Sequence, residues 1–187
     1  MELYAANMKS DQNTDDSIGE SASVFSGLVI ALLMCVPVVL SMLFFISQSL
    51  RLDEAQSIWQ SGRSVGYIVT LVAQDVHVPL YHLLLHFWRI AFGDTVTSAR
   101  LMSLTFYVAS IPVLYALGKL AYNRRVGMFA AFLFSISPFM NWYGNEIRMY
   151  TLFTFFVILN QYFFLKIFKS REHHDHVWAS YAFTAIF

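Results

Sequence analysis

Seven polar residues stand out because their types could perform chemistry and because they interrupt long apolar stretches. A carboxylate can take a proton from a hydroxyl as a general base. An arginine can bind a phosphate through two parallel hydrogen bonds, which a lysine cannot do as well. An acidic residue paired with a histidine can also ligate a divalent metal. The candidates are Asp53, Glu54, Asp75, His77, Glu146, Arg148 and Tyr150.

Each candidate also has a simpler interpretation. Asp53 and Glu54 are expected to be catalytic, with Asp53 as the base and Glu54 supporting it, or they merely begin a solvated helix. Arg148 is expected to bind phosphate, or it extends to lipid headgroups as interfacial arginines do. Glu146 either orients Arg148 or binds an acceptor or a metal. Tyr150 either donates a hydrogen bond to a phosphate or sugar, or belongs to the aromatic belt at the membrane surface.

Cofactor use is only weakly constrained. Asp75 and His77 could position a donor phosphate or hold a divalent metal together with Asp53, so the metal question stays open. The single cysteine, Cys35, excludes an internal disulfide. The sequence contains no glycine-rich phosphate loop or dinucleotide fingerprint. The net charge is zero, which does not suggest binding to nucleic acid.

Composition indicates a membrane protein. Of the 187 residues, 57% are hydrophobic and 13% are charged, against about 25% charged in a typical soluble domain. Roughly 20 apolar residues cross the hydrocarbon layer. We therefore predict an all-α, polytopic helical bundle with a disordered cytoplasmic tail, four spans and a fifth cut short where the sequence stops. The ranges are 1–20 for the tail, 21–50, 100–121, 126–143 and 149–168 for the spans, and 177–187 for the partial span.

The region 51–100 is predicted to be an external loop that contains juxtamembrane helices. Within it, the stretch HVPLYHLLLHFW at 77–88 is too short to cross comfortably and carries three histidines. We expect a helix over about 77–92 that lies in the membrane interface without crossing. A second external loop is expected at 144–149 and a cytoplasmic loop at 169–176.

The basic residues orient the bundle. Lys and Arg accumulate on the cytoplasmic side of membranes. The segment KLAYNRR connects the second predicted span to the third, and the segment KIFKSREHHDH follows the fourth. Both are therefore expected in the cytoplasm, which places the seven candidate residues together on the extracytoplasmic face, near substrates delivered from the lipid.

The ordered set of these residues resembles the polytopic GT-C glycosyltransferases. The likeness is greatest to the bacterial dolichyl-phosphate-mannose-protein mannosyltransferase-like group, which includes the aminoarabinose transferase that acts on lipid A. It covers about residues 24–170, the N-terminal part of such enzymes. One departure is Val78-Pro79, where the family usually has two prolines. The residues that carry the resemblance are Asp53-Glu54, Asp75-Val-His77-Val-Pro79-Leu80-Tyr81, Trp88, Phe92-Gly93, Arg100, Ala130-Ala131, Ser137-Pro138 and Glu146-x-Arg148-x-Tyr150.

The resemblance implies a function and a location. It implies transfer of a sugar from a polyprenyl phosphate to a hydroxyl of a protein, glycan or lipid, with Asp53 as the acidic residue at the end of the first helix. The multi-pass chain would lie in a bacterial plasma membrane with its active face outside. The alternatives are a transporter or flippase for a lipid-linked saccharide, or a fragment that is inactive alone. A transporter would place charges near the midplane of its spans, whereas the interiors of the predicted spans carry none.

Overall fold

The computed structural model describes residues 23–45, 48–74, 79–169 and 175–185, and all elements in these ranges are helical. Three helices are long and apolar enough to cross a membrane, namely Ser23–Leu43, α5 (Val96–Ala121) and α8 (Tyr150–Lys169). The predictions of an all-α fold and of a multi-pass membrane protein are confirmed. The predicted tail at 1–20 lies outside the described residues.

The remaining helices are shorter. The first helix ends in a π-helical turn, η1 (Ser41–Phe45), which the chain leaves towards α2 (Leu52–Ser61) and α3 (Val65–Gln74). Then follow α4 (Pro79–Phe92) before α5, and α6 (Arg124–Ser135) and α7 (Pro138–Tyr143) between α5 and α8. The last helix is α9 (Asp175–Ala185), which packs against α8.

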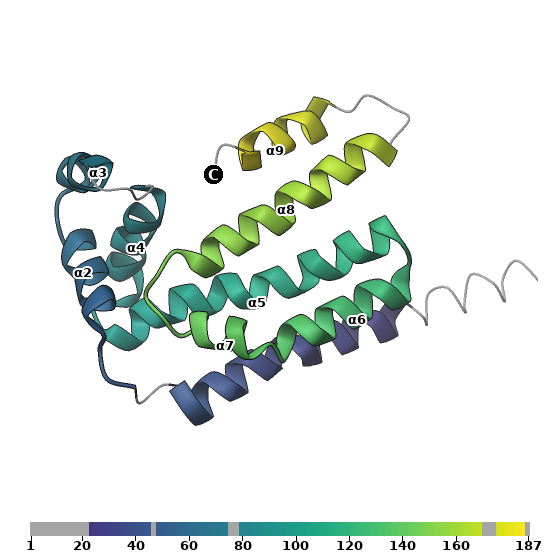
Figure 1. The fold of residues 1–187 in the computed structure, drawn as a ribbon, viewed down its shortest axis with the longest axis horizontal. Coiled ribbons are helices and arrows are strands. Elements are labelled where there is room, and N and C mark those ends of the chain that lie inside the picture. The colour runs from purple at the N-terminus through teal and green to yellow at the C-terminus, as the bar shows by residue number, and fades with distance from the viewer. Residues whose placement is uncertain (1–22, 46–47, 75–78, 170–174, 186–187) are drawn as a thin grey trace, which may run out of the picture.

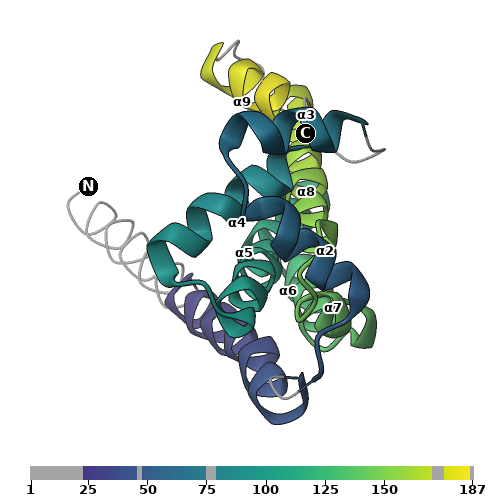
Figure 2. The ribbon, with the colours of Figure 1, turned by 90° about the vertical axis from the view of Figure 1, so that its left-hand side faces the viewer.

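The long helices lie side by side, and α5 packs against both α6 and α8 (Figure 1). The helices α2, α3 and α4 gather at the end of the bundle where α5 and α8 begin (Figures 1 and 2). The opposite end holds the α5–α6 turn and the end of α8, where Lys169 donates hydrogen bonds to the carbonyls of Leu120 and Ala121. We call these the α2 end and the basic end of the bundle.

The predicted span 126–143 is divided into α6 and α7. The division follows from Pro138, because the residue before a proline is pushed out of the helical region. Ser137 accordingly has ψ of 119°, and its hydroxyl accepts a hydrogen bond from the Met140 N–H at 3.4 Å, which caps α7. Together α6 and α7 still return the chain from the basic end to the α2 end (Figure 1).

The helix predicted over about 77–92 is observed as α4, with Pro79 as its first residue. Proline suits this position because its missing N–H would have no partner there. The 14 residues of α4 extend about 21 Å at 1.5 Å per residue, whereas the hydrocarbon core is about 30 Å thick. The helix is thus too short to cross a bilayer.

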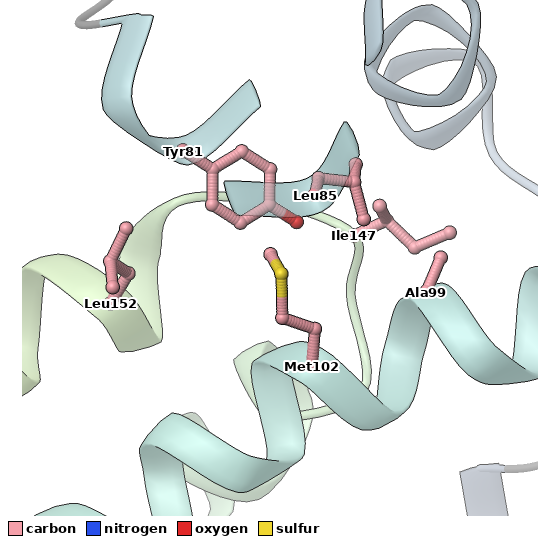
Figure 3. Packing of buried hydrophobic residues seen from close by; sticks show 6 residues of the cluster. All are labelled: Tyr81, Leu85, Ala99, Met102, Ile147 and Leu152. Atoms are coloured by element: carbon pink, nitrogen blue, oxygen red, sulfur yellow. The ribbon is translucent and has the colours of Figure 1, made fainter. Parts of the chain in front are cut away.

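A buried apolar cluster joins α4 to the bundle (Figure 3). Tyr81 and Leu85 of α4 meet Ala99 and Met102 of α5 and Leu152 of α8. Ile147, from the loop between α7 and α8, is fully buried in the same cluster. Because Ile147 is buried, its neighbours in the sequence are held at the α2 end.

Candidate functional site

The first turn of α2 presents two adjacent carboxylates to different surroundings. The helix buries one face, which includes Glu54, Ser57 and Ser61. Asp53 falls on another face, and its side chain is exposed and makes no hydrogen bond with any described residue. Helical geometry therefore separates the predicted pair into a solvent-facing Asp53 and a buried Glu54.

Glu54 lies at the centre of a buried ionic network. Its carboxylate accepts two hydrogen bonds from Arg100, from Nε at 3.0 Å and from Nη2 at 2.8 Å. The backbone N–H groups of Arg51 and Ile147 donate two more, each at 3.1 Å. The residue is 1% exposed. The network therefore fastens the start of α2 to the start of α5 and to the α7–α8 loop.

The same contacts set the ionisation of Glu54. Burial by itself raises the pKa of this carboxyl group, because the charged form loses its hydration. The hydrogen bonds from Arg100, Arg51 and Ile147 and the positive charge of Arg100 outweigh burial, so the pKa of Glu54 lies below its ordinary value. Glu54 is consequently a carboxylate at neutral pH.

Arg100 is the matching buried cation. It is 7% exposed, and beyond Glu54 it donates to the backbone carbonyls of Gln48 at 2.9 Å and Ser49 at 3.2 Å. These carbonyls belong to the segment between the first helix and α2. Arg100 thereby joins the start of α5 to the segment 48–54, which lies 46 to 52 residues earlier in the sequence.

The other end of α2 is held by α4. Nη1 of Arg89 donates to the carbonyl of Ile58 at 2.6 Å and to the Ser61 hydroxyl at 2.7 Å. Arg89 also pairs with Asp94, whose side chain is 72% exposed. Because α2 is held at both ends, the exposed carboxylate of Asp53 stands on a fixed support.

The α7–α8 loop is held mainly through Glu146 and Asn145. Glu146 pairs with Arg51 and accepts a hydrogen bond from Nε1 of Trp142 at 2.9 Å. The Arg51 guanidinium also lies over the Trp142 ring, 4.4 Å from its centroid. Ser41, in the last turn of the first helix, donates to the Asn145 side chain. Of the roles predicted for Glu146, which were to orient Arg148 or to bind an acceptor or a metal, none is seen as a contact among the described residues; its carboxylate meets Arg51 and Trp142.

Arg148 occupies the opposite side of the buried Ile147. Its side chain is partly exposed and makes no hydrogen bond or ion pair with any residue in the described ranges. It lies near Tyr81: burial raises the pKa of the Tyr81 hydroxyl, and the positive charge of Arg148 acts against this rise. The guanidinium therefore keeps its hydrogen-bonding capacity for another group.

The remaining candidates are distributed as follows. Tyr150 begins α8, is 38% exposed and packs edge-on against Tyr143 at a centroid distance of 4.5 Å. Asp75 and His77 lie outside the described residues. Within the ranges 23–45, 48–74, 79–169 and 175–185, no group of three or more His, Cys, Asp or Glu side chains is placed to hold a metal ion.

The sequence alone did not bring Arg51, Arg100 and Trp142 into the candidate site, although Arg100 is among the residues that carry the family resemblance. A signal existed, because a charge beside an uncharged stretch of 18 residues needs a partner if it is buried. The sequence did not say which of the acidic residues that partner would be.

The geometry defines an all-helical, multi-pass membrane protein in which the exposed carboxylate of Asp53 and the Arg148 guanidinium, unpaired among the described residues, lie at the same end of the bundle. The family described as dolichyl-phosphate-mannose-protein mannosyltransferase matches residues 76–187, and the chain belongs to this family. It is therefore a membrane glycosyltransferase of the GT-C type, from a family that uses polyprenyl-phosphate sugars. No curated protein and no solved structure matches the chain.

Proposed function

We propose that the protein transfers a sugar from a polyprenyl phosphate to a hydroxyl group of a protein, glycan or lipid at the extracytoplasmic face, with inversion at the anomeric carbon. One observation carries the proposal. The hydrogen bond from the Ile147 N–H to Glu54 joins segments 93 residues apart. Asp53 and Arg148 each lie one residue from this contact, so the residues that we propose as base and as phosphate ligand share one end of the bundle.

The reaction is a single displacement in this proposal. The acceptor oxygen bonds to the anomeric carbon as the bond from that carbon to the phosphate oxygen breaks, and the configuration inverts. Asp53 takes the proton of the attacking hydroxyl, which is a general-base role worth roughly 10²–10⁴-fold in rate. Arg148 stabilises the negative charge on the departing polyprenyl phosphate through paired hydrogen bonds.

The other candidate residues support these two. Glu54 is committed to Arg100 and to two backbone N–H groups, so it positions Asp53 and leaves the proton transfer to its neighbour. Glu146 positions the α7–α8 loop through Arg51. Tyr150, Asp75 and His77 remain proposed donor-binding residues, and the acceptor and any metal requirement are open.

The orientation proposal rests on the distribution of basic residues. Lys119, Arg124, Arg125, Lys166 and Lys169 belong to the basic end of the bundle. If that end faces the cytoplasm, the α2 end faces outwards. Cysteine scanning in a Cys35→Ser background tests this with a membrane-impermeant maleimide. Asp53→Cys should be labelled from outside, whereas Tyr122→Cys, at a position 78% exposed, should be labelled only after permeabilisation. The reverse pattern would refute the orientation.

The catalytic proposal is tested on the full chain in membranes, with a radiolabelled polyprenyl-phosphate sugar as the donor. Asp53→Asn should reduce turnover by about 10²–10⁴-fold without lowering the melting temperature, because the side chain is exposed. Asp94→Asn is the matched control, since it removes another exposed carboxylate, and it should retain activity. Full turnover by Asp53→Asn would exclude the proposed base.

A further inference from the structure

The basic end of the bundle contains a cavity that the proposed reaction does not use. It has a volume of about 330 Å³ and lies between the first helix and the α5–α6 turn. Its polar lining comes from Ser23 and Ser26 of the first helix, Tyr115 and Lys119 of α5, and Arg124 of α6. Two cationic side chains and three hydroxyl groups therefore surround one space.

We propose that this cavity binds the phosphate-containing headgroup of an anionic phospholipid. Phosphate oxygens accept hydrogen bonds, and the lining supplies ammonium, guanidinium and hydroxyl donors. Basic pockets between membrane helices commonly bind such headgroups on the cytoplasmic side. The site would thus be separate from the donor site at the α2 end.

Lys119 is not used to cap its own helix. A lysine near a helix C-terminus normally stabilises the unpaired carbonyls and the negative end of the helix dipole. In α5 this role falls to Lys169, whose Nζ donates to the carbonyls of Leu120 and Ala121. The Lys119 ammonium makes no hydrogen bond or ion pair with any residue in the described part of the chain, and it lines the cavity.

The position of the cavity favours a lipid over a free phosphate. Its lining comes largely from Ser23–Leu43 and α5, two helices that are long and apolar enough to cross a membrane. Ile30 of the first helix lines the same cavity, and Val24, Phe25 and Leu28, on other faces of that helix, are 59%, 65% and 66% exposed. A headgroup held between these two helices would leave its hydrocarbon chains beside their apolar stretches, where burial of apolar surface adds to binding.

The carrier lipid of the reaction is not the expected occupant. Lys119 lies about 28 Å further along α5 than Arg100, at 1.5 Å per residue. The proposed donor phosphate ligand, Arg148, is at the Arg100 end. A polyprenyl phosphate in the transfer site therefore cannot place the same phosphate in this cavity.

The test measures lipid retention by the full chain in nanodiscs of phosphatidylglycerol and phosphatidylcholine, followed by native mass spectrometry. Lys119→Gln and Arg124→Gln should each weaken phosphatidylglycerol retention about fivefold, from about 1 kcal/mol per basic residue. The matched control is Arg125→Gln, because Arg125 is exposed and does not line the cavity; it should change retention less than twofold. Equal losses in all three variants, or no retained phosphatidylglycerol in the unmodified chain, would overturn the proposal.

A second measurement avoids any folding defect in these variants. Tyr115 lines the cavity and is replaced by photoreactive benzoylphenylalanine, which preserves an aromatic ring. Crosslinks to phosphatidylglycerol would support the headgroup site. Crosslinks that form only with residues 1–20 of the chain, or with added polyprenyl phosphate, would overturn the proposed headgroup site.

Discussion

Replacement of Glu54 by glutamine should destabilise the α2 end far more than loss of a typical ion pair. Glutamine preserves the shape of the side chain but removes its charge and turns one acceptor into a donor. Arg100, at 7% exposure, would then keep only uncharged acceptors, namely the remaining amide oxygen and the backbone carbonyls of Gln48 and Ser49. A buried charge that loses its partner costs about 3–5 kcal/mol, whereas an exposed ion pair contributes about 0–1 kcal/mol.

The control uses the Arg89–Asp94 ion pair at the same end. In the Arg89–Asp94 pair the Asp94 side chain is 72% exposed, whereas in the Arg100–Glu54 pair the Glu54 side chain is 2% exposed. Asp94→Asn should therefore change stability by less than about 1 kcal/mol.

The assay is hydrogen exchange of the α2 amides together with thermal unfolding of the purified protein. Since about 1.4 kcal/mol corresponds to a tenfold change in an equilibrium constant, Glu54→Gln should accelerate hydrogen exchange of the α2 amides by about 10²–10³-fold or more. The double variant Glu54→Gln with Arg100→Gln should be less destabilised than the sum of the single variants, because the buried charge is removed with its partner. Equal effects of Glu54→Gln and Asp94→Asn would refute the buried network as the support of α2.

Three further predictions concern the ionisation of Glu54, the packing of α5 on α6, and donor binding by Arg148. Because the pKa of Glu54 is lowered in the folded state, its stabilising contribution is complete above the ordinary value of 4.5 and is lost as the pH falls through the lowered value. Melting curves between pH 7 and pH 3 should show this loss, and Glu54→Gln should remove it. Gly118→Ala should destabilise by about 1–3 kcal/mol, because the added Cβ would lie 2.6 Å from the Cα of Gly127; Gly66→Ala, with nothing within 4 Å, should stabilise α3 in the same melting assay. Arg148→Lys should raise the donor KM about tenfold, because lysine keeps the charge but loses the paired hydrogen bonds, and an unchanged KM would argue against phosphate binding.

It was predictable that the chain is a helical membrane protein, because this property depends on composition and on the length of uncharged stretches. The hydrocarbon layer requires long apolar helices whatever their neighbours are, so Ser23–Leu43, α5 and α8 could be found from local sequence. The break between α6 and α7 was also visible locally, since Pro138 follows Ser137. The prediction of one continuous span there gave hydrophobicity more weight than the conformational restriction before proline.

The candidate site was predictable only as a set of residue types at one end of the bundle. The sequence placed Asp53 and Glu54 side by side, but it could not tell which would be buried, because that depends on the surface that α2 meets. Nor could it pair Glu146 with Arg51 rather than Arg148. Which charged side chains pair depends on the distance between them and on how far each is desolvated. Both are set by packing among segments up to 95 residues apart in the sequence.

What the sequence determined by itself was therefore the helical membrane class, its apolar spans and the chemical types available at their ends. These follow from the solvent that each stretch of chain requires. Only the tertiary structure decided that Glu54 is a buried anchor for Arg100, that Asp53 stays exposed, and that Arg148 keeps its guanidinium uncommitted among the described residues. The physical reason is that a carboxylate becomes an anchor or a base according to the groups that surround it, and distant segments supply those groups.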